Sequence, residues 1–129
     1  MKQILVVDDD ADLRQTVRFL LMLEMPDVMV LEAPNGEEAI TLALANCPDL
    51  ILLDGNMPVM DGGETATALR RMPETHSIPL VAISAEGGDS PILRQLHTLC
   101  DISLPKPFSC EDLMSVIRAI PIYSEKSVL

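Results

Sequence analysis

The sequence predicts an α/β domain in which a five-stranded parallel sheet is covered by helices on both faces. Short apolar runs alternate with segments whose apolar residues recur every three or four positions, and this alternation occurs five times. Apolar residues make up 48% of the chain but aromatic residues only 2%, which favours a core of Leu, Ile, Val, Met and Ala. A length of 129 residues fits one domain with its own core.

The first two strand and helix pairs are bounded by clear local signals. The first strand ends at Val7, and Pro26 ends the helix that follows it. The second strand is expected at residues 28–31, and Asn35 is a good N-cap for the next helix because Glu38 lies three residues later. Both helices have apolar residues at one-face spacing: Leu13, Val17, Leu20 and Leu21 in the first, and Ile40, Ala43 and Leu44 in the second.

The remaining three pairs follow the same pattern. Strands are expected at residues 50–53, 80–83 and 102–104. Gly62-Gly63 ends the loop before the third helix, Ser90-Pro91 starts the fourth, and Ser109 with Asp112 starts the fifth. Residues 86–89 are expected to form a mobile loop. The apolar faces of these helices are formed by Ala66 and Leu69, by Ile92, Leu93, Leu96 and Leu99, and by Leu113, Val116, Ile117 and Ile120.

Composition also limits the location and the partners. We expect residues 1–120 to form the domain and residues 121–129 a frayed C-terminal tail. A net charge of −11, without a basic cluster, argues against binding to nucleic acid or anionic lipid. The N-terminus has neither a signal peptide nor a membrane span, so a cytoplasmic protein is expected. The three cysteines form no CxxC pair and are expected to be free buried thiols.

Charged residues stand at the ends of three predicted strands. Asp8, Asp9 and Asp10 follow the first strand, Asp54 closes the third, and Lys106 follows the fifth. If these strands are parallel neighbours, the charges converge at one edge of the sheet, where ligands bind in such folds. Like charges only a few ångströms apart disfavour mutual ionisation unless a cation lies among them. Carboxylate oxygens are ligands for Mg²⁺, which is therefore the expected occupant.

Each residue of this group also has a simpler explanation. The three consecutive aspartates suit a loop and helix N-cap, Lys106 suits a surface lysine, and Ser84 suits a turn after the fourth strand. Asp54 alone suits a polar residue that leaves the sheet for solvent. Taken together they indicate phosphoryl chemistry, because a carboxylate can attack a phosphoryl group when a metal and an ammonium neutralise its oxygens. Ser84 would then donate its hydroxyl to a phosphate oxygen.

Four stretches together resemble the receiver domain of two-component response regulators. They are ILVVDDD at residues 4–10, DLILLDGNMPVMDG at 49–62, PLVAISA at 79–85 and LPKPF at 104–108. All occur in the order and spacing of that family, and the resemblance covers residues 2 to about 120. It implies the strand order 2-1-3-4-5 of flavodoxin-like folds.

The resemblance also implies a function. Asp54 looks like the phosphoacceptor, Asp8 and Asp9 like the metal-site pair, and Asn56 like a further Mg²⁺ ligand through its carbonyl. Ser84 and Lys106 look like the phosphate-binding pair. The implied donor is a phosphohistidine on a histidine kinase or a histidine phosphotransfer protein, and small acyl phosphates are a lesser route. Such a domain is a phosphorylation-controlled switch that assists its own phosphorylation and dephosphorylation, rather than an enzyme.

Two residues depart from the family pattern, and two others bear on the lifetime of the phosphoryl group. Gly55 replaces a bulkier apolar residue and is expected to loosen the loop. Ser103 replaces the Tyr or Phe that usually moves inward with the hydroxyl residue, so the output surface is expected to differ. Asn56 and Glu86 occupy positions that tune hydrolysis in the family, and their pairing resembles chemotaxis-type regulators, which predicts a short-lived phosphoryl state.

Other functions remain open. The main alternative is a receiver-like interaction module that is not regulated by phosphorylation. A Mg²⁺-dependent aspartyl phosphatase would usually have Asp-x-Asp after the first strand and a cap, and neither is visible here. A flavin-binding carrier of the same architecture would need a Gly, Ser and Thr-rich loop and aromatic partners. The resemblance is compatible with a monomer or a weak homodimer whose downstream target is a protein.

Overall fold

The computed structural model contains one five-stranded parallel sheet with the order β2-β1-β3-β4-β5. It describes residues 2–85 and 91–120. The predicted loop at residues 86–89 and the predicted tail at residues 121–129 lie outside the described residues. The strands are β1 Gln3–Val7, β2 Met29–Ala33, β3 Leu50–Asp54, β4 Leu80–Ala85 and β5 Ile102–Lys106. The predicted fold class and strand order are confirmed.

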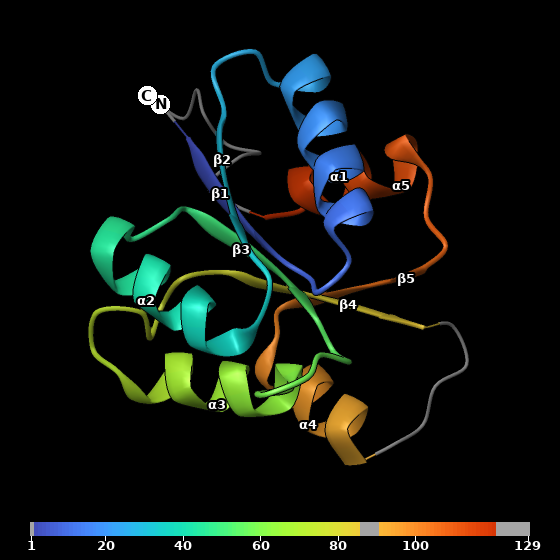
Figure 1. Ribbon diagram of the computed structural model, residues 1–129. Coiled ribbons are helices and arrows are strands. Elements are labelled where there is room, and N and C mark those ends of the chain that lie inside the picture. The colour runs from blue at the N-terminus through green and yellow to red at the C-terminus, as the bar shows by residue number, and fades with distance from the viewer. Residues whose placement is uncertain (1, 86–90, 121–129) are drawn as a thin grey trace.

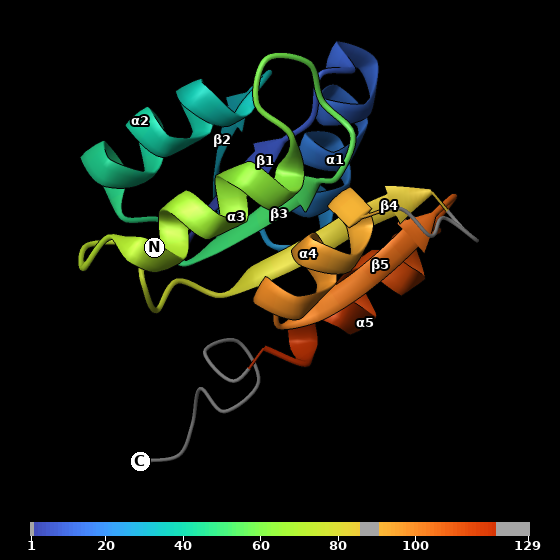
Figure 2. The same cartoon turned by 90° about the horizontal axis from the view of Figure 1, so that it is seen from below.

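Helices cover both faces of this sheet. They are α1 Ala11–Glu24, α2 Gly36–Asn46, α3 Gly62–Arg71, α4 Pro91–Leu99 and α5 Cys110–Arg118. Figures 1 and 2 show α1 and α5 on one face, and α2, α3 and α4 on the other. This arrangement leaves the central strands buried on both sides, as crossover helices require.

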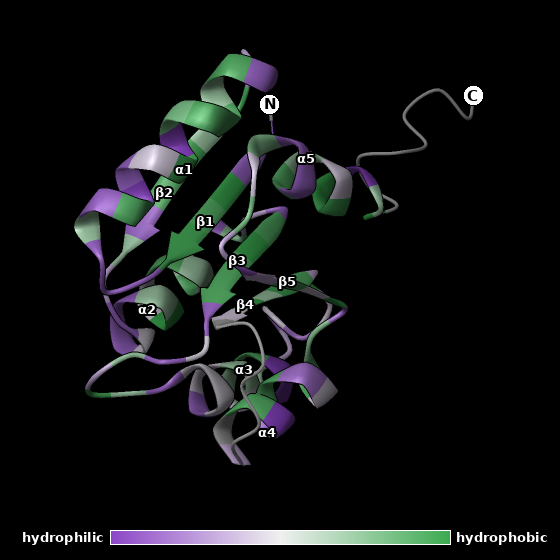
Figure 3. Cartoon of the chain, turned by 90° about the vertical axis from the view of Figure 1, so that its right-hand side faces the viewer, coloured by the Kyte–Doolittle hydropathy of each residue, from purple (hydrophilic) through white to green (hydrophobic). Residues whose placement is uncertain are grey.

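Alternation along the strands divides the core into two layers. Side chains of successive strand residues point to opposite faces, so Leu5 and Val7 lie with α2, α3 and α4, whereas Ile4 and Val6 lie with α1 and α5. Every residue of β3 is buried, which explains its almost continuous apolar sequence. Figure 3 shows the same hydrophobic character along β1 and β3. The polar residues at the ends of these strands are therefore exceptions that need an explanation.

Side-chain caps start α2 and α5 where the sequence predicts, but Gly62 and Gly63, predicted to lie in the loop before the third helix, are the first residues of α3 because Asp61 caps it. Asn35 accepts a hydrogen bond from the Glu38 N–H, and Ser109 forms a reciprocal capping box with Asp112. Asp61 forms a second capping box at the start of α3, which the sequence analysis did not identify. Each cap satisfies a backbone donor that a helix leaves unpaired.

Some strand boundaries differ from the prediction. The second strand runs from Met29 to Ala33 because its pairing with Gln3–Val7 of β1 sets its length. β5 extends through Pro105 to Lys106, where these residues pair with Ser84 and Ala85 of β4. A proline is tolerated there because β5 lies at the sheet edge, where one side of the strand needs no N–H donor. Tertiary pairing, rather than local composition, decides these ends.

The cysteines are only partly as expected. All three are free, but Cys47 is exposed, and Cys100 and Cys110 are half-buried, so the prediction of buried thiols is wrong for Cys47. Cys47 is the C-cap of α2 and has left-handed backbone torsions, with φ 46°. This position follows the helix end and lies outside the core. Among the described residues, no helix is long and apolar enough to cross a membrane.

We predict that Gly62→Ala destabilises the domain and that Gly63→Ala does not. A Cβ on Gly62 would lie 2.5 Å from the Asp54 carbonyl oxygen and 2.8 Å from the Gly55 Cα, both backbone atoms. A Cβ on Gly63 would lie 2.7 Å from Oε1 of Gln95, the end of a flexible side chain. Gly62→Ala should lower the free energy of unfolding by about 1–3 kcal/mol, whereas Gly63→Ala gains helix propensity.

Urea unfolding of the two variants measures this difference. Because both changes are Gly to Ala in the first turn of α3, the comparison isolates the close approach of Gly62 to the end of β3. Equal midpoints for the two variants would contradict it.

Candidate functional site

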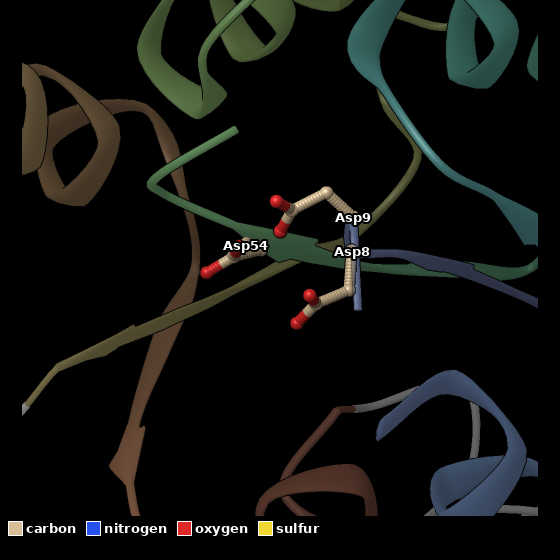
Figure 4. A group of neighbouring side chains, drawn as sticks. All are labelled: Asp8, Asp9 and Asp54. Atoms are coloured by element: carbon tan, nitrogen blue, oxygen red, sulfur yellow. The ribbon is translucent and has the colours of Figure 1, made fainter. Parts of the chain in front are cut away.

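Three aspartates meet where β1 and β3 end. β1 and β3 are paired neighbours, with Val7 opposite Leu53, so the next residues, Asp8 and Asp54, leave the sheet side by side. Carboxylate oxygens of Asp8, Asp9 and Asp54 all lie within 4.8 Å of one another, and Figure 4 shows the three side chains grouped at this edge. Asp8 and Asp54 are only 2% and 3% exposed, whereas Asp9 is exposed. The predicted convergence of these residues is confirmed.

Lys106 joins the cluster from β5. Its Nζ lies 3.2 Å from Oδ2 of Asp8 and 3.3 Å from Oδ1 of Asp54. The side chain reaches past the end of β4, which separates β5 from β3 in the sheet. The bond between Lys106 and Pro107 is cis. One ammonium therefore pairs with two buried carboxylates.

Local hydrogen bonds fix the position of Asp8. Its Oδ1 accepts a bond from the Asp10 N–H at 2.9 Å, and its Oδ2 accepts one from Lys106. The carbonyl oxygen of Asp8 accepts a bond of 2.6 Å from Nη1 of Arg14, which also pairs with Glu32. Arg14 was not predicted as a site residue, although its place in the first turn of α1 puts it beside the preceding loop.

Asp10 has a different role from its two neighbours. Its carboxylate accepts hydrogen bonds from the N–H groups of Asp12 and Leu13, so it is the N-cap of α1. The aspartate run therefore divides into two residues that join the cluster and one that starts a helix. The cap explanation considered for the whole run holds for Asp10 alone.

Ser84 and Asn56 lie near the same edge. Ser84 comes one residue after Ile83, which pairs with Asp54, and it is 5% exposed. Its Oγ lies 3.4 Å from Nε2 of His97 in α4. Asn56 is exposed in the loop after β3, and a backbone hydrogen bond from it lowers the pKa of Asp54. Glu86, predicted to tune hydrolysis, lies outside the described residues.

His97 was not predicted as a site residue. Its signal is the helical spacing from Leu93, because residues four positions apart share a helix face. Leu93 faces the core, and His97, although exposed, reaches Ser84 at the sheet end through its Nε2.

Burial sets the protonation of this cluster. Burial raises the pKa of Asp54 most, and the charge of Asp8 raises it further, against the lowering effect of Lys106. The pKa of Asp54 is about 6 instead of its ordinary 3.8. Burial lowers the pKa of Lys106, but the charges of Asp54 and Asp8 outweigh it and raise that pKa overall. The positive charge of Lys106 is thus not enough to let Asp54 ionise at its ordinary pH.

The donor set suits a hard divalent cation. Three carboxylates supply oxygen ligands, two of them held by hydrogen bonds and the third exposed to solvent. Mg²⁺ prefers such ligands and retains several waters, which an open edge allows. A cation here would also relieve the repulsion that raises the pKa of Asp54.

An apolar groove of about 490 Å³ lies beside the cluster. It runs between α1 and the segment after β5, and it is lined by Asp10, Leu13, Thr16, Leu20, Lys106, Pro107 and Phe108. A second molecule in this groove would contact Lys106, whose ammonium pairs with Asp8 and Asp54.

Sequence comparison places the chain in a known family. Residues 4–118 match the family described as the response regulator receiver domain. The transcriptional regulatory protein CpxR of Escherichia coli is 40% identical over 120 residues, which are 93% of this chain and 49% of CpxR. The phosphate regulon regulatory protein PhoB of Pseudomonas aeruginosa is 35% identical over 92% of this chain and 51% of PhoB. The chain therefore spans about half the length of these relatives.

Solved structures agree with this placement. The chemotaxis protein CheY4 of Vibrio cholerae superposes with a TM-score of 0.80 and is 31% identical, covering 93% of this chain and 98% of that one. The receiver domain of the Pseudomonas aeruginosa sensor histidine kinase PA1611, solved with a magnesium ion coordinated in its active site cleft, has a TM-score of 0.79. At 24% identity over 92% of this chain and 95% of that one, that likeness shows the fold alone. This chain belongs to the response regulator receiver domain family.

Proposed function

We propose that this domain is a signalling switch whose phosphoacceptor is Asp54. The observation that supports the assignment is the ammonium of Lys106, which pairs with Asp54 and Asp8 at once, beside the exposed Asp9. A carboxylate is a competent nucleophile toward phosphorus when nearby positive charge offsets the charge of the phosphoryl oxygens. Asp54 combines this setting with a fixed place at the end of a buried strand.

The proposed reaction transfers a phosphoryl group from a phosphohistidine. An Oδ atom of Asp54 forms a bond to phosphorus, and the P–N bond of the donor breaks. The electron pair stays on the imidazole nitrogen, which then takes up a proton. Lys106 neutralises charge on the phosphoryl oxygens, and Ser84 donates its hydroxyl to one of them. The donor supplies the activated group, so the domain contributes positioning and charge.

Asp8, Asp9 and Asp54, together with the carbonyl of Asn56, are the residues that would hold Mg²⁺. When bound, the ion supplies positive charge that offsets the oxygens of the transferred group. Asp8 is positioned for this role by Arg14 and by the Asp10 N–H, so its carboxylate has little freedom to turn away. The exposed Asp9 leaves one side of the cluster open to water and to the donor.

Hydrolysis resets the switch. Water attacks the phosphorus of the acyl phosphate, which releases inorganic phosphate and returns Asp54 to a carboxylate. The domain assists this step through the same charges, which makes it a self-resetting phosphoacceptor rather than a turnover enzyme. We expect a short-lived phosphoryl state.

The proposed partner is a histidine kinase or a histidine phosphotransfer protein. The apolar groove beside Lys106 supports it, since a donor helix docked there would bring its phosphohistidine to the cluster. The acidic domain itself is not expected to bind nucleic acid, and its downstream target is a protein. We assign residues 1–120 to the receiver domain, propose a monomer or weak homodimer, and place it in the cytoplasm, where free thiols persist.

Phosphorylation of Asp54 is the first test. Incubation with a small acyl phosphate and Mg²⁺ should add one phosphoryl group to Asp54, because this carboxylate both pairs with Lys106 and closes the buried strand β3. Mass mapping of the modified peptide measures it. Asp54→Ala should abolish the modification, and Lys106→Ala should slow it about a hundredfold. Unmodified protein after incubation with both small and phosphohistidine donors would instead favour an interaction module without phosphorylation.

Magnesium affinity separates the neighbouring aspartates. Asp9→Asn should weaken Mg²⁺ binding about tenfold or more, because it removes one charged ligand. Asp10→Asn makes the same change of charge one residue away but keeps the helix cap, since Asn is also a good N-cap. Titration calorimetry measures both affinities. Similar losses in the two variants would mean that general charge, rather than the cluster, holds the ion.

The phosphoacceptor should reduce stability. Its pKa of about 6 exceeds the ordinary 3.8, so the folded state favours protonated Asp54. The contribution of protonated Asp54 to the free energy of unfolding is fully present below pH 3.8 and is lost as the pH rises through about 6. In chelator at pH about 7.5, Asp54→Asn should therefore raise the free energy of unfolding by about 1–3 kcal/mol.

Urea unfolding at several pH values measures this gain, which should shrink as the pH falls toward about 4. Asp27→Asn makes the same change of charge at an exposed position and serves as the control. A gain that is absent, or that does not depend on pH, would show that Asp54 is not strained by its burial.

A further inference from the structure

Helix α4 packs directly on the residue that follows Asp54. A Cβ on Gly55 would lie 2.7 Å from Cδ2 of Leu93 and 3.1 Å from Cδ2 of Leu96. Gly55 is buried, its N–H donates to the Ile83 carbonyl, and its carbonyl accepts from the Gly62 N–H. The absence of a side chain at Gly55 therefore allows α4 to pack closely on the end of β3.

Helix α4 also reaches Ser84, the residue proposed to bind a phosphoryl oxygen. His97 lies four residues after Leu93, so the contact that seats Leu93 on Gly55 directs the imidazole toward the end of β4. There Nε2 of His97 lies 3.4 Å from the hydroxyl of the buried Ser84. The helix thus contacts the neighbours of the phosphoacceptor at two points, one apolar and one polar.

The small side chain of Ser103 explains why the ring beside the Ser84 hydroxyl can come from α4. Ser103 pairs with Ala82, two residues before Ser84, so Ser84 and Ser103 share the sheet face that α4 covers. An exposed serine at this position provides no ring to approach the Ser84 hydroxyl from β5. The imidazole that approaches it comes from α4 instead.

We propose that His97 is a positioning residue of the phosphate site. Its Nε2 accepts a hydrogen bond from the Ser84 hydroxyl until a phosphoryl oxygen on Asp54 accepts that bond instead. This inference rests on the proposed function of Asp54. A serine hydroxyl has one proton, so it cannot donate to the ring nitrogen and to a phosphoryl oxygen at once. Phosphorylation therefore releases the imidazole, and α4 loses its polar contact with Ser84.

The affinity for a phosphoryl mimic tests whether His97 and a phosphoryl group compete for the Ser84 hydroxyl. His97→Leu keeps the bulk but removes the acceptor, which frees the Ser84 hydroxyl for the phosphoryl group. Beryllofluoride with Mg²⁺, a phosphoryl mimic, should bind this variant about two- to tenfold more tightly, which is the range for one hydrogen bond. His97→Gln retains an acceptor and should bind like the wild type. In a Ser84→Ala background, His97→Leu should have no effect.

The response of α4 gives an independent readout. Amide chemical shifts of residues 96–99 should change on beryllofluoride binding in the wild type and in His97→Gln, and much less in His97→Leu. Equal affinities and equal shifts in all three proteins would overturn the role of His97 while leaving Asp54 as the phosphoacceptor. Failure of the wild type to bind the mimic, or equal binding by Asp54→Ala, would overturn the proposed function and this inference together. Thermal unfolding of each variant confirms that it is folded.

Discussion

The pairing of one lysine with two buried carboxylates is the constraint on which the site depends. Asp8 and Asp54 emerge side by side because β1 pairs with β3 in parallel register. Burial raises the pKa of Asp54, and Lys106 offsets part of this effect without removing it, since that pKa remains about 6. The cluster is therefore prepared for additional positive charge and for a phosphoryl group that arrives with it.

The scaffold holds this unfavourable arrangement in place through backbone contacts. The Asp8 side chain and carbonyl are fixed by the start of α1, and the end of β3 is enclosed by α3 and α4 through Gly62 and Gly55. These approaches are so close that a single Cβ would enter the space of a neighbour. The same contacts make α3 and α4 sensitive to events at Asp54, because packed elements shift as units rather than deform.

Much of this was predictable from sequence, because periodicity and strand-end charges follow directly from burial. The fold class, the helix caps at Asn35 and Ser109, and the convergence of Asp8, Asp9, Asp54 and Lys106 all appear in the chain itself. Strand ends were less predictable, since pairing with β1 extends β2 to Ala33. The sequence suggested a helix cap within the aspartate run, but which aspartate caps α1 and whether His97 contacts Ser84 depend on how the helices pack, which no local pattern specifies.

The most direct measurement is a titration of the Asp54 carboxyl carbon by NMR, with and without Mg²⁺. Without the ion, Asp54 should titrate near pH 6, well above the ordinary 3.8, because burial and Asp8 oppose its charge. With saturating Mg²⁺, its midpoint should fall clearly, because the added charge stabilises the carboxylate. A midpoint near 3.8 that Mg²⁺ does not change would contradict the account, since Asp54 would then belong to no strained, cation-seeking cluster.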